Sequence, residues 1–261
     1  VPKESVIEIH GQVSTSKEAP NGIEVIMNDF IVLSESKAVL PLDVTGKTPV
    51  MPQQRFDYRT LDLRNPKNHA LIQIESKIVE GMTEFLNAQG FIQVFTPCIM
   101  GSASESGAEV FKIDYYGKKA FLRQDPQLHR QLTIASGFEK IYDLGPNWRA
   151  ELSHTTKNLC EHRAIAAEMA FINDEQDVMR MQENLIVAAI KKVNHECKEQ
   201  LALLDIKLKV PETPFPELRF PKIYEILEKQ GKNIYGQDLD SEAEKILYEY
   251  VKKKYNSEFY F

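Results

Sequence analysis

The chain has 261 residues, of which 43% are hydrophobic, and a formal charge of −6; this permits one large domain, or one domain and part of another. The acidic balance argues against a uniformly basic protein that wraps nucleic acid, so any RNA contact is expected from local basic patches. The three cysteines are too widely spaced for a zinc framework, and we expect a reducing, cytoplasmic setting. No apolar run is long enough to span a bilayer, so no membrane partner is expected.

The first 45 residues alternate between apolar and polar side chains, as strands do. We expect three strands here, at Val6–Val13, Ile23–Met27 and Phe30–Leu33, with a turn at Pro20–Gly22 between the first two. Three strands are too few for a closed five-stranded barrel. Residues 46–66, which contain prolines and Gly46, are expected to form a linker.

Helical and strand patterns follow one another through residues 67–261. Apolar side chains recur at helical spacing from Lys67 to Gln89, where Gly90 marks the end, and a strand is then expected up to Pro97. The later elements predicted are helices at 174–199, 224–229 and 242–254, a strand at 201–215, and a strand that begins at 259–261 and has no partner downstream. Helices and strands together predict an α+β fold.

The segment from Asn147 to Phe171 is the most informative part of the sequence. An apolar strand is expected to carry Arg149 and Glu151 at positions i and i+2, hence on one face, and a second strand to return after a polar loop. Arginine suits a phosphate, and a carboxylate can accept a hydrogen bond from an exocyclic amine such as that of adenine. A strand with a surface ion pair is the alternative interpretation of this pattern.

Several segments carry a resemblance to a known family. In chain order, they are 91–97, 105–108, 124–131, 137–142 and the hairpin at 147–171. They resemble motifs 1 and 2 of the class II aminoacyl-tRNA synthetases, and among these the aspartyl enzymes of archaeal and eukaryotic cytosolic type. The resemblance implies an antiparallel sheet flanked by helices and preceded by a partial OB-type β-barrel. Residues 1–45 would be the C-terminal part of the anticodon-binding domain, 46–66 the hinge, and 67–261 the catalytic domain with motifs 1 and 2 only.

The same resemblance implies an activity. It is the ATP-dependent activation of aspartate to aspartyl-adenylate and its transfer to tRNA(Asp), by a homodimer that forms through motif 1. Mg²⁺ would assist, but its main family ligands lie outside this chain. A motif 3 strand and helix normally complete such a site, and nothing in the sequence matches them, so we expect the chain to be incomplete.

The resemblance also implies roles for single residues. Arg149 would contact the α-phosphate and serve catalysis. The ATP site would contain Arg149 together with Glu151, Lys157 and His162. The aspartate site would contain Glu105, Gln127 and Arg130, with Arg130 in the place of a family lysine that faces the substrate side-chain carboxylate. Without the resemblance, Gln127 and Arg130 would be interpreted as a helix N-terminal turn with a surface arginine.

Departures from the family pattern are concentrated on substrate contacts. Asp125 replaces a serine and could pair with a nearby cation, Asn158 loses a possible phosphate contact, and His162 offers less stacking area than phenylalanine. Ala166 removes the carboxylate expected to hold the substrate ammonium group. These changes leave two alternatives open: a synthetase-derived paralogue without ligase activity that acts as a binding or regulatory module, or an asparaginyl-type enzyme.

Overall fold

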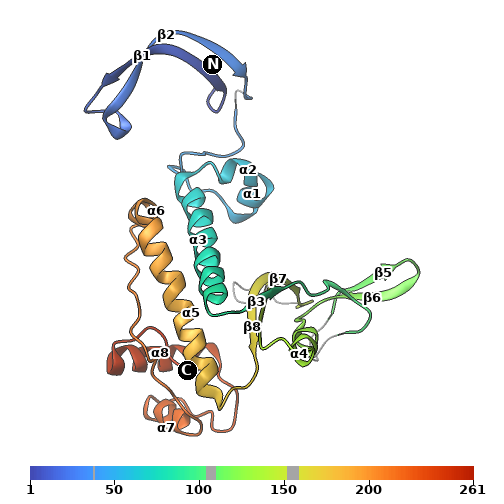
Figure 1. Cartoon of the computed structure of the whole chain (residues 1–261). Coiled ribbons are helices and arrows are strands. Elements are labelled where there is room, and N and C mark those ends of the chain that lie inside the picture. The colour runs from blue at the N-terminus through green and yellow to red at the C-terminus, as the bar shows by residue number, and fades with distance from the viewer. Residues whose placement is uncertain (38, 104–109, 152–158) are drawn as a thin grey trace. The chain divides into compact units, whose positions relative to one another are not determined.

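The computed structural model of the chain describes residues 1–37, 39–103, 110–151 and 159–261. The chain divides into two units, residues 1–69 and residues 70–261, and each is described here by itself. Figure 1 labels the helices and strands of both units. Within the described residues, no helix combines the length and the apolar character that a bilayer crossing requires.

The N-terminal residues form one long hairpin. Strand β1 (Val6–Thr15) pairs antiparallel with β2 (Ile23–Ser34), and the turn expected between them is confirmed as a short 3₁₀ segment, η1 (Pro20–Gly22). The expectation of two separate strands after this turn was wrong. Asn28 and Asp29, the residues between the two expected strands, belong to β2, and Asp29 pairs with His10 inside the ladder. A polar pair need not interrupt a strand that is exposed along its length. A partial OB-type barrel stays a prediction.

Two short helices, α1 (Pro52–Asp57) and α2 (Arg59–Asp62), occupy the segment expected to be only a linker. Asp62 explains their placement, because its carboxylate is 4% exposed and accepts hydrogen bonds from Arg55 and Arg59. A buried carboxylate with two guanidinium partners is compensated for the water it loses. The alternation of basic and acidic residues in this segment therefore builds local structure.

Two long helices lie side by side in the second unit (Figure 1). The predicted long helix is confirmed as α3 (Pro66–Ala88), and the next as α5 (Glu175–Glu196). At their crossing a Cβ on Gly81 would lie 2.8 Å from the Cβ of Lys192, so the absence of a side chain permits the close approach. The amine of Lys192 contacts the carboxylates of Glu80, Glu84 and Glu196 at 2.7 to 2.9 Å, which ties the two helices together.

The segment directly after α5 differs from the prediction. The expected strand from Leu201 to Phe215 was wrong, since a further helix, α6 (Lys198–Leu203), follows α5 and the residues after it form no strand. Val193, Cys197 and Leu201 form one buried cluster across the α5–α6 junction. Their four-residue spacing fits a helical face, and burial of this face favours helix over strand.

A three-stranded sheet in the order β3-β7-β8 is the centre of the unit. Strand β3 (Ile92–Val94) pairs parallel with β7 (Lys140–Trp148), which pairs antiparallel with β8 (Glu161–Met169). The sheet is therefore mixed, with the predicted antiparallel hairpin as its main part. Helices α3 and α5 cover one face, where Tyr142 packs in a cluster with Leu86, Phe91, Ile165, Met169, Met181 and Leu185.

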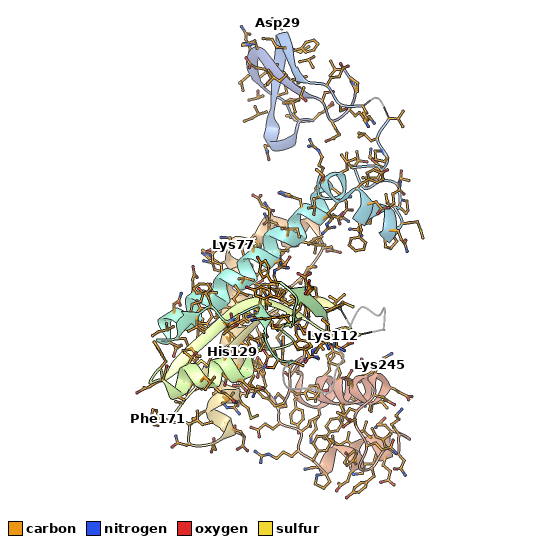
Figure 2. All side chains as sticks on the ribbon, turned by 90° about the vertical axis from the view of Figure 1, so that its right-hand side faces the viewer. Asp29, Lys77, Lys112, His129, Phe171 and Lys245 are labelled. Carbon is orange, nitrogen blue, oxygen red and sulfur yellow. The ribbon has the colours of Figure 1, made fainter. Side chains whose placement is uncertain are left out.

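Helix α4 (Gln127–Ala135) lies on the opposite side of this sheet (Figures 1 and 2). A second sheet in the order β4-β6-β5 leads into α4; its strands are β4 (Ile99–Met100), β5 (Lys112–Tyr115) and β6 (Lys118–Leu122). Figure 2 marks His129 on α4 and Lys77 on α3, on the two sides of the β7–β8 hairpin.

The C-terminal part packs as a helix pair, α7 (Lys222–Lys229) and α8 (Ser241–Tyr255), both predicted. Its core consists of Ile223, Ile226, Leu227, Ala243 and Leu247. The last residues are not assigned to a strand, but Phe261 exchanges backbone hydrogen bonds with Pro216 and Leu218 at 2.9 and 2.6 Å. The partner of this segment thus precedes it in the sequence.

Candidate active site

The β7–β8 hairpin holds Arg149 and Glu151, both predicted to bind ATP, in a backbone conformation that differs from the prediction. Strand β7 ends at Trp148, the backbone N–H of Arg149 donates to Cys160 O at 2.9 Å, and that of Glu151 donates to Arg149 O at 2.8 Å. The extended strand expected to carry Arg149 and Glu151 therefore does not reach them: β7 ends before Arg149, and a tight turn joins the two residues. Arg149 is exposed and Glu151 is half-buried. Glu105 and Lys157, also predicted for the site, lie outside the described residues.

The hairpin has a second face, opposite to α3 and α5. Because side chains alternate along strands, Asp143, Gly145 and Asn147 of β7 share this face with their cross-strand partners Ala166, Ala164 and His162. We call it the site face. His162 is half-buried on it. Small residues occupy its centre, and polar or charged residues lie at both ends.

Arg123, a buried arginine that the sequence analysis did not single out, lies against the site face. The side chain of Arg123 is 2% exposed; its Nε donates to Pro146 O at 2.6 Å and its Nη1 contacts Asp143 Oδ2 at 3.1 Å. Nη1 also donates to the hydroxyl of Thr96, which in turn donates to Asp143. A Cβ on Gly145 would lie 2.1 Å from Nη2 of Arg123, so only glycine leaves room for this guanidinium.

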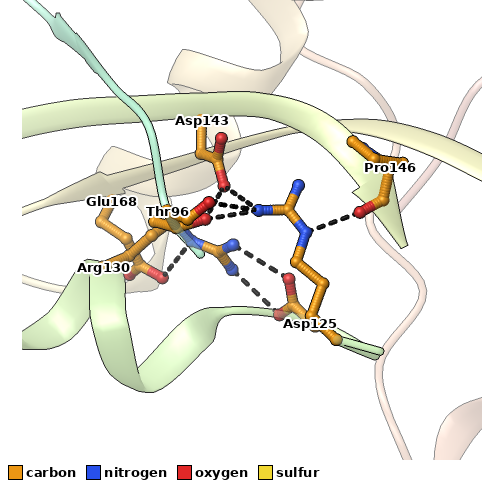
Figure 3. A network of polar contacts seen from close by, with 7 residues as sticks. Thr96, Asp125, Arg130, Asp143, Pro146 and Glu168 are labelled. Carbon is orange, nitrogen blue, oxygen red and sulfur yellow. Dashed lines mark hydrogen bonds and ion pairs between the residues drawn. The ribbon is translucent and has the colours of Figure 1, made fainter. Parts of the chain in front are cut away.

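Arg130 of α4 lies next to this network and is held by two carboxylates (Figure 3). Nη1 and Nη2 donate to Asp125 Oδ1 and Oδ2, both at 2.9 Å, and Nε donates to Glu168 Oε1 at 3.2 Å. The residue is 4% exposed, so it is not a surface arginine. Burial works against the charged form, but the hydrogen bonds and charges of Asp125 and Glu168 outweigh it and raise the pKa of Arg130.

The two networks together carry a small negative charge. Two guanidinium groups, Arg123 and Arg130, face the three carboxylates of Asp125, Asp143 and Glu168, which leaves a formal charge of −1. The expectation that Asp125 could pair with a nearby cation is confirmed by its bidentate contact with Arg130. The position of Arg130 on the sheet side of α4 is therefore fixed by protein groups.

Two further residues complete the description of this region. Gln127, predicted to contact the amino acid, is exposed at the first turn of α4. Asn147 is 5% exposed, and its Oδ1 has no hydrogen-bond partner among the residues that the structure describes. A buried amide without a partner is costly in a folded protein, and it is common where a ligand supplies the missing bond.

Sequence reasoning missed Arg123, Asp143, Thr96 and Asn147. One signal was present, since Arg123 directly follows the apolar residues Ala120 to Leu122 of a short strand, where an arginine needs a buried partner. The partners themselves are 20 and 27 residues away in the chain, so no local pattern identifies them.

The described residues form no evident metal site. Among the side chains of residues 1–37, 39–103, 110–151 and 159–261, no group of three or more His, Cys, Asp or Glu is placed to hold an ion. The carboxylates of the site face are instead engaged by guanidinium groups. The described residues of the site face therefore do not fit a Mg²⁺ site.

Comparison with known proteins places this geometry in a family. Residues 51–261 match the family model of class II tRNA synthetases (D, K and N). The chain is 42% identical over 94% of its length to an aspartate–tRNA(Asp/Asn) ligase of Methanopyrus kandleri. It is 40% identical over its whole length to an aspartate–tRNA(Asp) ligase of Pyrococcus furiosus. It spans 57% and 60% of the length of these two relatives.

Solved structures show the same relationship. The asparaginyl-tRNA synthetase of Pyrococcus horikoshii, complexed with asparaginyl-adenylate, superposes with a TM-score of 0.83 at 29% identity, over 95% of this chain and 57% of that one. The sequence match is higher to relatives named for aspartate than to this asparaginyl structure. The resemblance to class II synthetases and the α+β fold are thereby confirmed. The chain belongs to the class II tRNA synthetases of the D, K and N group.

Proposed function

We propose that the protein is an aspartate–tRNA ligase, which activates L-aspartate with ATP and transfers it to tRNA. The observation that carries this proposal is the identity of 40% or more, over 94% and 100% of the chain, to two relatives named as aspartate–tRNA ligases. Activation is the attack of a carboxylate on the α-phosphorus of ATP, with pyrophosphate as the leaving group. It needs no nucleophilic side chain; it needs positioning and cations at the phosphates.

The β7–β8 hairpin supports this chemistry. Arg149 follows the last residue of β7, where the register with β8 holds its backbone, while its guanidinium remains exposed for a phosphate. We assign to it the α-phosphate and the stabilisation of charge that develops in the transition state. Glu151 would accept a hydrogen bond from the amino group of adenine, and His162 would stack on the base. Lys157 would contribute a further charge to ATP.

The amino-acid subsite is proposed around the start of α4. Gln127 is exposed there and would contact the substrate, and Glu105 would close over it. Arg130 would face the side-chain carboxylate of aspartate. Of its five N–H groups, three already donate to Asp125 and Glu168. The two that remain, one on Nη1 and one on Nη2, offer a ligand only single hydrogen bonds while both carboxylates stay in place.

The partners and the compartment are proposals as well. The two relatives differ in their tRNA, one being named for tRNA(Asp) and the other for tRNA(Asp/Asn), so we propose tRNA(Asp) as the common substrate. A homodimer through motif 1 is supported by apolar side chains that are exposed on α3 and beyond β3: Leu71, Ile72 and Phe95. A cytoplasmic location is supported by the free thiols of Cys98, Cys160 and Cys197.

A second candidate function is a synthetase-derived module without ligase activity. It is favoured by Ala166, which offers no carboxylate on the site face, and by the engagement of Arg130 with two acidic side chains. Such a protein would keep the fold and bind nucleotide or RNA without forming an adenylate.

Pyrophosphate exchange with L-aspartate and ATP separates these functions. For a ligase, we expect Arg149→Ala to lower the exchange rate by about 10²-fold or more, because it removes a donor to the transition state. Arg163→Ala is the matched control, since Arg163 lies in the same hairpin on the opposite face and its side chain is 71% exposed. No exchange by the unmodified full-length protein would favour the second function, and an unchanged rate in Arg149→Ala would reject the role of Arg149.

A further inference from the structure

The guanidinium of Arg130 has both of its hydrogen-bonding edges occupied by carboxylates. The end formed by Nη1 and Nη2 binds Asp125 through two bonds of 2.9 Å, and Nε on the side edge donates to Glu168 at 3.2 Å. A planar guanidinium offers a carboxylate two parallel N–H groups on either of these edges. An incoming carboxylate can therefore form a bidentate pair with Arg130 only if Asp125 or Glu168 gives way.

Asp125 is the more exposed of the two partners. It lies in the turn before α4, outside any strand or helix, and its side chain is 33% exposed. Glu168 belongs to β8, where Ile141 is its neighbour across the ladder, and its side chain is 25% exposed. The Arg130 side chain itself is 5% exposed and starts from a helix. A rotation of Asp125 into water costs less than a shift of the strand or the helix, because water replaces the lost hydrogen bonds of an exposed carboxylate.

Asp125 is also chemically equivalent to the proposed ligand. Its side chain is the same carboxylate on the same single methylene as the side chain of L-aspartate, and it occupies the guanidinium as that ligand would. A neutral amide side chain could not replace it as well, because charge-assisted hydrogen bonds are the stronger ones.

We infer that Asp125 is a specificity-determining residue, an internal competitor that the side-chain carboxylate of aspartate displaces from Arg130. This inference rests on the proposed function and deepens it, since it states how the same site recognises its amino acid. When aspartate binds, the ion pair between Arg130 and Asp125 is replaced by an ion pair between Arg130 and the ligand. Asp125 therefore lowers the affinity for aspartate. It also reduces the ratio of the affinity for aspartate to that for asparagine.

The test is calorimetry of L-aspartate and L-asparagine binding to the full-length protein and to Asp125→Asn. The amide keeps the size of the side chain but removes the charge that competes. We expect the affinity for aspartate to rise about tenfold, which corresponds to about 1.4 kcal/mol, a value at the lower end for one charge-assisted hydrogen bond. The affinity for asparagine should change much less. Asp125→Ser, which also shortens the side chain, should act in the same direction.

Glu217→Gln is the matched control. Glu217 pairs with Arg180 and Arg219, and its side chain is 26% exposed, close to the exposure of Asp125, but it lies outside the site. Its removal should leave both amino-acid affinities unchanged. Urea unfolding of each variant establishes that the fold is intact.

Each outcome decides the inference. If folded Asp125→Asn binds aspartate no better than the unmodified protein does, or more weakly, Asp125 only positions Arg130 and the inference is wrong. An equal gain for aspartate and asparagine would also overturn it. Absence of aspartate binding and of pyrophosphate exchange in every protein would overturn the proposed function, and this inference with it. If the unmodified protein binds aspartate but Asp125→Asn shows no gain in aspartate affinity, the inference is overturned and the proposed function is not.

Discussion

The ion pair between Arg123 and Asp143 gives the sharpest prediction about what holds the site together. Both side chains are almost completely buried, with exposures of 2% and 4%, and the Nη1–Oδ2 distance is 3.1 Å. In Arg123→Met, the hydroxyl of Thr96 would be the one donor left to the carboxylate of Asp143 among the residues that the structure describes. An uncompensated buried charge destabilises a protein by about 3 to 5 kcal/mol. We expect a loss of that size in the free energy of unfolding.

A double-mutant cycle tests whether the two charges compensate each other. Asp143→Leu alone should cost a similar amount, since Arg123 would keep Pro146 O and Thr96 as acceptors but lose its counter-charge. The double variant removes both charges and leaves an apolar pair of similar volume. It should therefore be less destabilised than the sum of the single variants by about 2 kcal/mol or more.

Urea unfolding of the full-length protein measures all three variants. An unchanged dependence on urea concentration would show that the unfolded state is comparable between them. The exposed pair of Arg163 and Glu161, at 3.8 Å with side chains that are 71% and 52% exposed, is the control. A surface pair of this kind contributes about 1 kcal/mol or less. Additive losses in the Arg123–Asp143 cycle would refute the view that each charge is stabilised by the other.

Two further predictions concern stability. Gly145→Ala should lower the free energy of unfolding by about 1 to 3 kcal/mol, because the new Cβ would lie 2.1 Å from Nη2 of the anchored Arg123. The control is Gly101→Ala, whose Cβ would meet nothing within 4 Å and which should be near neutral. Equal effects of the two substitutions would contradict the steric argument. Hydrogen bonds from Lys192, the larger contribution, and from Lys77 lower the pKa of Glu196 from 4.5 to about 2. The folded value is below the unfolded one, so this stabilisation is present above about pH 4.5 and is lost as the pH falls towards 2. As the pH falls from 4.5 towards 2, the free energy of unfolding should decline less in Glu196→Gln than in the unmodified protein. Parallel curves of unfolding free energy against pH for the two proteins would contradict this prediction.

Local patterns in the sequence predicted the elements that depend on local chemistry. The apolar spacing of α3 and of α5, and the turn after β1, appear in the structure close to their predicted bounds. Asp174 also accepts a hydrogen bond from the N–H of Gln176 and so caps the start of α5. Such features depend on residues within a few positions of each other, and the sequence displays them directly.

The errors arose where tertiary contacts or a single turn decided the conformation. The strand alternation expected for Arg149 and Glu151 does not continue past Trp148, because the hydrogen bond from Glu151 N to Arg149 O closes a tight turn. The residues after Leu201 have strand-like composition, but Leu201 is buried beside Cys197 and belongs to the helix α6. Intrinsic preference is weak compared with such packing.

The candidate site was predictable in part. Arg130 was identified, and its pairing with Asp125, five residues away, was within reach of sequence reasoning. Its second partner, Glu168, is 38 residues away, and Thr96 lies 47 residues from Asp143. The resemblance to a family supplied the positions of the expected substrate contacts, but it did not indicate that the cation among them, Arg130, is already paired.

Ala166 and Asp125, two departures from the family pattern, are related through the charge of the site face. Ala166 lies directly across the ladder from Asp143 and two residues from Glu168, on the same face of β8. A carboxylate at position 166 would face Asp143, and like charges in directly opposed positions of a sheet are destabilising. With Asp125 present, it would also make the formal charge of the network more negative, from −1 to −2. An alanine at 166 therefore suits a site in which Asp125 already contributes a carboxylate, and the two positions are better interpreted as one redistribution of charge than as two independent losses.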